Sequence, residues 1–345
     1  MNKKKVTMQT IADYLGITKV TVSKALNNQP GVSNDLKKHI WEVSKKLGYS
    51  KKESLKLMNE EKQLAFLISK RFFLENDNFY SQIYYYLNKE CVKKNIDLNL
   101  YIINSLDEDN LVLPFSFRKN NLDGIFLAGE FTSQYMDSIV KLNIPVIAID
   151  FYNYYIKTDC VITDNFYASY LATTYLIENG HKNIGFVGDP NYTSSVLDRF
   201  YGYLKAIRQK GLEYNEEWNI INNDTNGAYI LDYSLPNTLP TAFLCHCDMA
   251  AWNILQKLKI QGISVPEQIS LISFDNTELS KNCIPPLTTI NISKQEFAYK
   301  SLNQLLWRIN NRTSEPQRIY LTTQLIERNS VLTINDKNYV QLGIS

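Results

Sequence analysis

The chain has 345 residues, of which 44% are hydrophobic and 21% charged, enough to form two or three domains with sizeable cores. No apolar run approaches the roughly 18 residues that suggest a membrane-spanning helix, and no apolar signal segment opens the chain, so we expect a cytoplasmic protein with no membrane partner. The five cysteines are odd in number and scattered, which does not indicate a disulfide framework.

The net charge of +2 conceals an uneven distribution along the chain. Residues 1–58 hold 12 Lys and 4 acidic residues, which gives +8, whereas the rest of the chain holds 25 basic and 31 acidic residues, which gives −6. A basic segment joined to an acidic body is typical of a DNA-binding domain fused to a second function. Charge therefore predicts DNA binding near the N-terminus.

Residues 6–26 predict two short helices joined by a tight turn. Thr7 can cap the first helix, Gly16 can end it in the left-handed conformation, and Thr18 can cap the second. Apolar residues recur at helical spacing in both segments, at Ile11, Ala12, Leu15, Val22, Ala25 and Leu26. The pattern predicts a helix-turn-helix, although any pair of capped amphipathic helices would look similar, and the basic charge is what favours DNA.

The second helix of this pair carries the candidate DNA contacts. Lys19, Val20 and Lys24 are left facing outward, and the N-terminal part of such a helix lies against base edges, so these three are candidate base readers. Thr21 and Ser23 suit contacts to phosphates. The other candidate DNA-binding residues of this segment are Thr7, Thr18, Asn27 and Ser33.

A third helix is predicted between Ser33 and Gly48, so that three helices and one small core account for residues 6–49. The run VTMQTIADYLGITKVTVSKALNN, followed by GVS and KKLGY, resembles the head of the lac repressor/galactose repressor family of bacterial transcriptional regulators over its whole length. The resemblance implies an all-α head that binds double-stranded operator DNA.

Residues 50–62, SKKESLKLMNEEK, are rich in charges and contain no aromatic residue, which is typical of a solvated linker. The family resemblance implies instead a hinge that folds on the operator and inserts an apolar side chain into the minor groove. By position, Met58 matches the inserted residue. Because Lys51 and Lys52 replace the family's usual Pro and Asn, we expect this hinge to form less readily.

Beyond residue 64, apolar runs of strand length alternate with amphipathic segments, which predicts an α/β body of parallel sheets with helices on both faces. The pattern occurs twice and so predicts two lobes. The predicted strands are LAFLIS, LNLYII, GIFLAG and IPVIAID in one half, and NIGFVG, NIIN, PTAFLC and ISLISFD in the other. Helices are expected near 79–95, 107–120, 131–142, 165–179, 197–210, 226–232 and 249–261.

The family resemblance continues from about Leu64 to Val331. It rests on the blocks IPVIAID, TDN, YLIENGHKNIGFVG, DRFYGYLKAI, PTAFLCHCDMAA, GISVPEQISLISFDN, IPPLTTI and LIERNSV. It implies the fold of periplasmic sugar-binding proteins, in which the chain crosses between the lobes three times, the last time near Thr322. The implied domains are a head (1–49), a hinge (50–62) and a body (63–345), with lobe one at about 63–162 and 292–322 and lobe two at about 163–291 and 323–345.

In open α/β sheets, ligands bind beyond the carboxyl ends of the strands, so the cleft between two such lobes is the expected effector site. Carboxylates and a guanidinium can bridge neighbouring hydroxyls of a polyol, while aromatic faces suit its C–H side. The candidate effector-binding residues, in part implied by the resemblance, are Phe79, Tyr80, Asp150, Phe151, Arg199, Trp218, Cys247 and Asp275. Cys247 and Ile292 stand where family members often carry amides, which favours an effector with fewer hydroxyls, such as an aryl glycoside or an amino sugar.

Cys245, His246, Cys247 and Asp248 invite comparison with a zinc site, but alternation along a strand would point His246 away from the two thiols. We therefore expect no metal and no cofactor. The sequence shows no Gly-rich phosphate loop and no Ser/His/Asp or Cys/His array in a catalytic context, so we expect no enzymatic activity.

Three other classes of protein remain alternatives. A sugar-transport protein would lack the basic head, a glycoside hydrolase would leave that head unexplained, and a regulator of the same kind could respond to a nucleobase or to a phosphorylated partner protein. We expect a homodimeric repressor of a carbohydrate-utilisation operon that binds a pseudo-palindromic operator under the control of a small effector in the cleft. Residues 335–345 are too short for the heptad helix by which longer family members tetramerise, which favours a dimer.

Overall fold

The computed structural model describes residues 6–27, 29–49, 62–73, 78–119, 122–224, 227–230 and 232–334. The chain divides into two compact units, Met1–Glu61 and Lys62–Ser345. The proposed hinge insertion by Met58 and the expectation for the tail 335–345 fall outside the described residues. Lys62, placed in the hinge from sequence, is the first residue of a strand.

The N-terminal unit contains the three predicted helices, α1 (Met8–Leu15), α2 (Lys19–Leu26) and α3 (Asn34–Lys46). The predicted caps are confirmed, because the side chains of Thr7, Thr18 and Ser33 each accept a backbone N–H from the first turn of the following helix. Gly16 ends α1 with a φ of 65°, the left-handed conformation that glycine adopts at no steric cost. The helices pack on a core that includes Ile11, Ala12, Val22, Ala25, Leu26, Ile40 and Val43.

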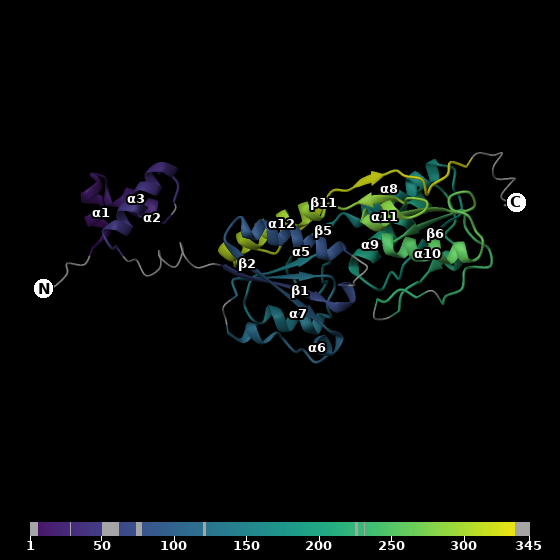
Figure 1. Cartoon of the computed structure of the whole chain (residues 1–345), viewed down its shortest axis with the longest axis horizontal. Helices are drawn as coiled ribbons and strands as arrows, with labels where there is room; N and C mark the ends of the chain where they lie inside the picture. The colour runs from purple at the N-terminus through teal and green to yellow at the C-terminus, as the bar shows by residue number, and fades with distance from the viewer. Residues whose placement is uncertain are drawn as a thin grey trace. The chain divides into compact units, whose positions relative to one another are not determined.

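The first lobe of the body is built on a six-stranded parallel sheet in the order β11-β5-β4-β3-β1-β2. Its strands are β1 (Lys62–Ser69), β2 (Ile96–Ile103), β3 (Gly124–Ala128), β4 (Val146–Ile149), β5 (Asp159–Thr163) and β11 (Arg318–Leu321). Successive residues of β1 point to opposite faces, where helices cover both sides (Figure 1). The helices of this lobe are α5 (Phe79–Val92), α6 (Ser105–Asp109), α7 (Ser133–Val140) and α12 (Lys294–Asn310), with the short 3-10 helices η1 (Lys70–Phe72) and η2 (Phe115–Lys119).

The second lobe repeats the plan with the strand order β12-β10-β9-β8-β6-β7. Its strands are β6 (Ile184–Val187), β7 (Asn219–Ile220), β8 (Ala242–Cys245), β9 (Ser270–Asp275), β10 (Thr288–Asn291) and β12 (Gln324–Ile326). Only β12 among these runs antiparallel to its neighbour. The helices are α8 (Asn165–Glu178), α9 (Ser194–Gln209), α10 (Asp248–Ile260) and α11 (Glu278–Asn282), with the 3-10 helix η3 (Glu216–Trp218).

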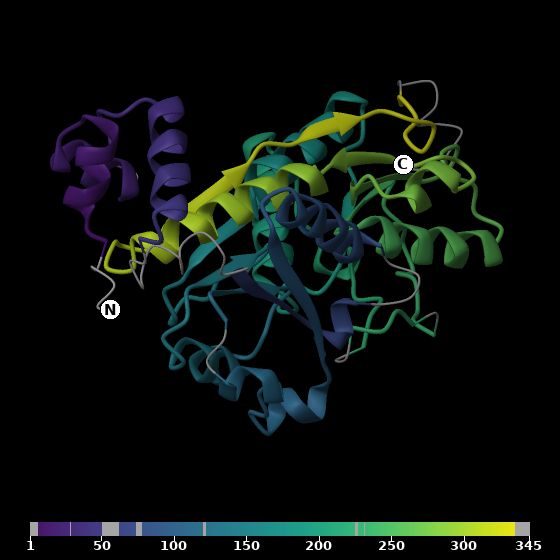
Figure 2. The ribbon, with the colours of Figure 1, turned by 60° about the vertical axis from the view of Figure 1, so that its left-hand side comes forward.

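The chain passes between the two lobes three times, as the family resemblance implies. The passages lie between β5 and β6, between β10 and α12, and between β11 and β12. The last one falls at residues 322–323, and Figures 1 and 2 show the yellow ribbon of β11 and β12 running from one lobe to the other. This connectivity brings the carboxyl ends of the central strands of both sheets to a shared cleft.

Two predicted helices are wrong. The segment near 107–120 forms the short α6 and η2 instead of one helix, because Leu111 takes a φ of 56° and Pro114 cannot continue a helical ladder. Near 226–232, the described residues contain no helix; Asn223 and Tyr229 form an antiparallel bridge, and Gly227 between them has a φ of 82°. Among the helices that the structure describes, none is both long and apolar enough to cross a bilayer.

Candidate DNA-binding surface and effector cleft

Helix α2 presents a polar, basic face and buries its apolar one. Lys19, Val20 and Lys24 are exposed, and the Val20 side chain is 62% exposed although it is apolar. An exposed valine at the start of a recognition helix can contact a thymine methyl group, and the two lysines can bond to guanine or phosphate. The three candidate base readers are therefore all accessible to solvent.

Several candidate DNA-binding residues of the head carry a hydroxyl group that forms hydrogen bonds within the helices or at their ends. The Oγ1 atoms of Thr18 and Thr21 lie 2.8 Å apart, and the Thr21 N–H donates to Thr18 Oγ1 at 3.1 Å. Asn27 Nδ2 donates to Ser23 Oγ at 3.3 Å. Thr7, Thr18 and Ser33 thus have a structural task that would be required whether or not they also contact DNA.

The cleft between the lobes is lined from both sides. Six of the eight predicted effector residues line it, namely Phe79, Tyr80, Asp150, Arg199, Cys247 and Asp275. Asp150 follows β4 of the first lobe and Asp275 ends β9 of the second, so each lobe presents a carboxylate at a strand terminus. Both residues have a positive φ, 67° and 100°, a strained conformation for residues other than glycine that is characteristic of functional sites.

The carboxylate of Asp150 is strongly affected by its burial in the cleft. The Tyr80 hydroxyl donates to its Oδ2 at 2.9 Å, and its Oδ1 is buried with no hydrogen-bond partner among the described residues. Burial raises the pKa of Asp150 from 3.8 to about 6, against the opposing effects of Arg199 and of the Tyr80 hydrogen bond. Burial and the neighbouring Asp150 also raise the pKa of Tyr80, so the phenol remains a donor.

Arg199 is held rigidly in the wall of the cleft. Its Nε donates to Asn165 Oδ1 at 2.8 Å, its Nη1 donates to the backbone oxygen of His246, and its guanidinium lies over the Phe274 ring at 4.5 Å. Nη1 also lies 3.8 Å from Asp275 Oδ1. A guanidinium positioned by four neighbours can bind an effector with little loss of side-chain entropy.

Asp248 supports the cleft from beneath. Its Oδ1 accepts hydrogen bonds from the hydroxyls of Ser273 and Thr289, and its Oδ2 accepts from the N–H and hydroxyl of Thr277. These bonds tie α10 to the segments on either side of Asp275. Asp248 is therefore a structural carboxylate that fixes the end of β9.

Three residues that we expected at the effector site are not among those that line the cleft. Phe151 is 1% exposed and packs into the core of the first lobe, because the residue after the strained Asp150 turns inward. Trp218 donates its indole N–H to the Thr238 carbonyl at 2.8 Å and is not among the cleft-lining residues. Ile292 is likewise buried in the core and away from the cleft lining, so Cys247 is the one of the two amide replacements that lies in the cleft.

Several cleft residues were missed from the sequence. Arg71 and Phe72 follow β1, while Tyr192, Tyr229 and His246 come from loops of the second lobe. The signal that could have found Arg71, Phe72 and His246 is their position just beyond the end of a strand. Tyr229 lies in the segment wrongly predicted as a helix, and no local pattern marks it.

The expected orientation of His246 was also wrong. Cys247 lies beyond β8 and caps α10, its sulfur accepting the Ala250 N–H at 3.3 Å, so strand alternation does not apply to it. Its sulfur lies 3.5 Å from His246 Nε2 and 2.9 Å from the Tyr229 hydroxyl. Burial, with Arg199 nearby, lowers the pKa of His246 to about 4, so the imidazole is neutral at physiological pH. No group of three or more metal-ligating side chains occurs in the part of the chain that the structure describes.

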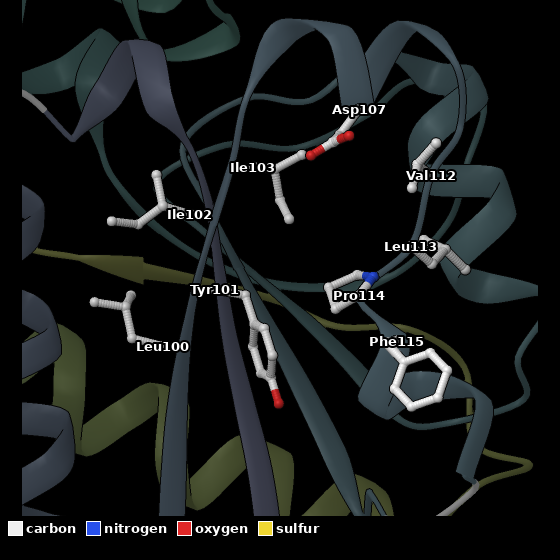
Figure 3. Close-up of a pocket in the computed structure, with 9 residues that line it drawn as sticks. All are labelled: Leu100, Tyr101, Ile102, Ile103, Asp107, Val112, Leu113, Pro114 and Phe115. Carbon is white, nitrogen blue, oxygen red and sulfur yellow. The ribbon is translucent and has the colours of Figure 1, made fainter.

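A larger cavity of about 510 Å³ lies away from the cleft, at the edge of the first lobe. Figure 3 shows residues of the edge strand β2 facing the segment that carries Asp107 and Phe115. Its lining has only one ionisable carboxylate and lacks the paired charges of the cleft. The cleft is therefore the better candidate for a polar effector.

Comparison with known proteins assigns both parts of the chain to known families. Residues 7–52 match the family described as bacterial regulatory proteins, lacI family, and residues 173–331 match a periplasmic binding protein-like domain. Over 341 residues the chain is 30% identical to the HTH-type transcriptional repressor PurR of Actinobacillus pleuropneumoniae serotype 3 (strain JL03), covering 95% of this chain and 99% of that protein. The chain belongs to the lacI family of bacterial regulatory proteins.

Solved structures show the same fold as this lacI-family chain. The complex of the transcriptional regulator CelR with cellobiose has a TM-score of 0.67 at 21% identity and covers 94% of this chain and 99% of its own. The lac repressor dimer bound to operator and the anti-inducer ONPF has a TM-score of 0.66 at 20% identity, covering 95% and 100%. A lacI-family regulator from Enterococcus faecium with bound ribose has a TM-score of 0.66 at 24% identity, covering 79% and 100%.

Family membership settles the class of activity. LacI-family proteins are DNA-binding transcriptional regulators, not enzymes. The chain is accordingly a DNA-binding transcriptional repressor with a helix-turn-helix head.

Proposed function

We propose that this repressor is controlled by a small sugar-like effector bound between the two lobes, and that it regulates a carbohydrate-utilisation operon. The observation that carries the proposal is the pair of strand-terminal carboxylates in one cleft: Asp150 of the first lobe lies opposite Asp275 and Arg199, which both belong to the second lobe. Carboxylate and guanidinium groups of this kind bridge neighbouring hydroxyls, and the rings of Tyr80 and Tyr229 can cover the C–H face of a sugar. The cellobiose and ribose in two structurally similar regulators agree with this class of effector.

A second candidate effector is a nucleobase. Five aromatic residues line the cleft, Phe72, Phe79, Tyr80, Tyr192 and Tyr229, and a flat heterocycle can stack on such rings. The polar groups of the cleft favour a sugar, because they lie on both lobes and can meet hydroxyls around a whole ring. Nucleobases therefore belong in any ligand panel.

We infer that an effector changes the distance between the lobes when it binds. The cleft encloses about 80 Å³ in this conformation, less than the cavity of about 150 Å³ that holds a benzene molecule. Hydrogen bonds cross it: the Ser194 N–H donates to Glu130 Oε2 at 2.6 Å, and the Tyr152 N–H donates to Ser194 Oγ at 3.2 Å. An effector that favours one lobe separation over another would shift this equilibrium, and with it the fit of a dimer to a pseudo-palindromic operator.

The proposal is tested by thermal unfolding of the purified chain against sugars, glycosides, sugar phosphates and nucleobases. A ligand that binds the folded state raises the unfolding midpoint by mass action, and we expect this for uncharged sugars or glycosides. The shift should disappear in Arg199→Ala and Asp275→Ala and persist in Arg312→Ala, an exposed arginine. Stabilisation by a nucleobase alone, or by no compound in the panel, would contradict the sugar-like effector.

A further inference from the structure

Arg71 lies in the cleft wall although no sequence motif indicated it. It belongs to η1, the short helix that follows β1, and it lines the same cleft as Asp150. The strands that precede these two residues, β1 and β4, flank β3 in the first sheet. Arg71 and Asp150 therefore approach the cleft from the same lobe.

The guanidinium of Arg71 is fixed by its surroundings. Its Nη2 donates to the Glu130 backbone oxygen at 2.7 Å and lies 3.8 Å from Glu108 Oε1, while its guanidinium lies 5.0 Å from the centre of the Phe72 ring. Glu108 is fixed in turn by the Thr132 N–H at 2.7 Å. The Arg71 Nε atom is buried and has no hydrogen-bond partner among the residues that the structure describes.

Two residues that line the cleft thus each carry a buried polar atom, and the two atoms are of opposite type. Arg71 Nε–H is a donor without an acceptor, and Asp150 Oδ1 is an acceptor without a donor within the described parts of the chain. Buried polar atoms are nearly always hydrogen-bonded, because an unpaired one loses its hydration without compensation. A ligand that supplies one acceptor and one donor would satisfy both atoms.

The charges around the cleft favour an uncharged ligand. Three cationic side chains stand against four carboxyl groups, namely Arg71, Arg199 and Lys294 against Glu108, Glu130, Asp150 and Asp275. The N-terminus of α9, which could otherwise attract a phosphate, already donates its Ser194 N–H to Glu130. The cleft therefore has no surplus positive charge for an anionic group.

We propose that Arg71 is an effector-binding residue whose Nε–H donates to an oxygen of an uncharged, hydroxylated effector, while a hydroxyl of the same effector donates to Asp150 Oδ1. This assignment rests on the proposed sugar-like effector and narrows it to compounds without a phosphate or carboxylate. It also makes Arg71 a determinant of which hydroxyl pattern is accepted, because its position is fixed by Glu108, Glu130 and Phe72.

The test measures calorimetric affinity of the full chain for cellobiose, ribose, glucose and their methyl glycosides, with glucose 6-phosphate and ribose 5-phosphate as charged counterparts. The variants are Arg71→Lys, which keeps the charge but removes the Nε–H, and Arg71→Ala. Arg312→Lys is the matched control, because it makes the same exchange at an exposed position. The unfolding midpoint of each ligand-free variant reports whether it is folded.

For the uncharged ligand that binds best, we expect Arg71→Lys to weaken affinity by about ten-fold or more, because a charge-assisted hydrogen bond is lost, and Arg312→Lys to leave it unchanged. We also expect one deoxy analogue of this ligand to bind the wild-type chain weakly, and to bind the Arg71→Lys variant with the same low affinity. The hydroxyl that this analogue lacks is then the one that accepts the hydrogen bond from Arg71 Nε. The weaker binding of one analogue is measured on the wild-type chain, so this part of the test holds even if the variant fails to fold.

Wild-type affinity in folded Arg71→Lys, equal sensitivity of every analogue, or tighter binding of a sugar phosphate would overturn the assignment of Arg71. If Arg199→Ala abolishes binding while Arg71→Lys does not, only Arg71 is wrongly assigned and the proposed function stands. If no compound binds the wild-type chain, both proposals fail.

Discussion

Asp150 links the stability of the body to its function at the scale of one residue. Its pKa in the folded chain is about 6, above its ordinary value of 3.8, so the folded state binds the proton more tightly than the unfolded state does. The corresponding stabilisation is present below pH 4 and is lost as the pH rises through 6. At neutral pH the chain therefore keeps an ionised carboxylate in the cleft at a cost in stability, as binding sites commonly do.

Replacing Asp150 by Asn should remove this cost. We expect Asp150→Asn to raise the free energy of unfolding by about 1 to 3 kcal/mol at pH 8, with little change at pH 4. Chemical denaturation at both pH values measures the effect, and Asp137→Asn, at a half-exposed site outside the cleft, serves as the control. A variant that is less stable than the wild type at pH 8 would show that the ionised carboxylate stabilises the fold.

At the same scale, the sequence predicted the charged cleft residues better than the aromatic ones. Asp150, Arg199 and Asp275 could be predicted because they occupy strand ends or match a family block. Trp218 was misplaced because an aromatic residue is equally suited to a core, where this one hydrogen-bonds to Thr238. The unpaired Nε of Arg71 could not be predicted from the sequence. The contacts that fix its guanidinium come from segments about 40 and 60 residues further along the chain.

At the scale of the element, the caps and the exposed face of the head make separate contributions. Thr18→Ala removes the bond to the Thr21 N–H and should destabilise the head by about 1 kcal/mol, weakening binding to all DNA sequences alike. Lys19→Ala, one position further on, should leave the melting of the head unchanged and relax the preference for particular operator positions. Thermal melting of the head and affinity for operators with single-base changes distinguish the two variants. If Lys19→Ala lowered the affinity equally for every DNA sequence, Lys19 would contact phosphate only.

Helices were predicted correctly where residues close together in the sequence determine them. The head helices are set by caps and by Gly16, all within a few residues, and the predicted helices and caps agree with the structure. The segment near 107–120 failed because its helical periodicity is interrupted by Leu111 and Pro114. The segment around Gly227 failed because the bridge between Asn223 and Tyr229 decides its conformation.

For the molecule as a whole, we propose that ligand binding in the cleft controls DNA binding by the head. The family, the fold and the DNA-binding class follow from the sequence blocks, because their order constrains a global topology with three passages between lobes. The effector does not follow from them, because it depends on a few side chains in one cleft. A coupling of about 1 to 3 kcal/mol between the two sites would change operator affinity by roughly 5- to 150-fold.

The most direct test is the affinity of the full chain for its operator, measured by fluorescence anisotropy with and without the uncharged ligand that stabilises the chain most. We expect a shift of roughly 5-fold or more, in either direction, at saturating ligand, and the loss of that shift in Arg199→Ala while DNA binding itself remains. The same operator affinity at zero and saturating ligand would contradict it, because a ligand bound in the cleft would then have no influence on the DNA-binding head.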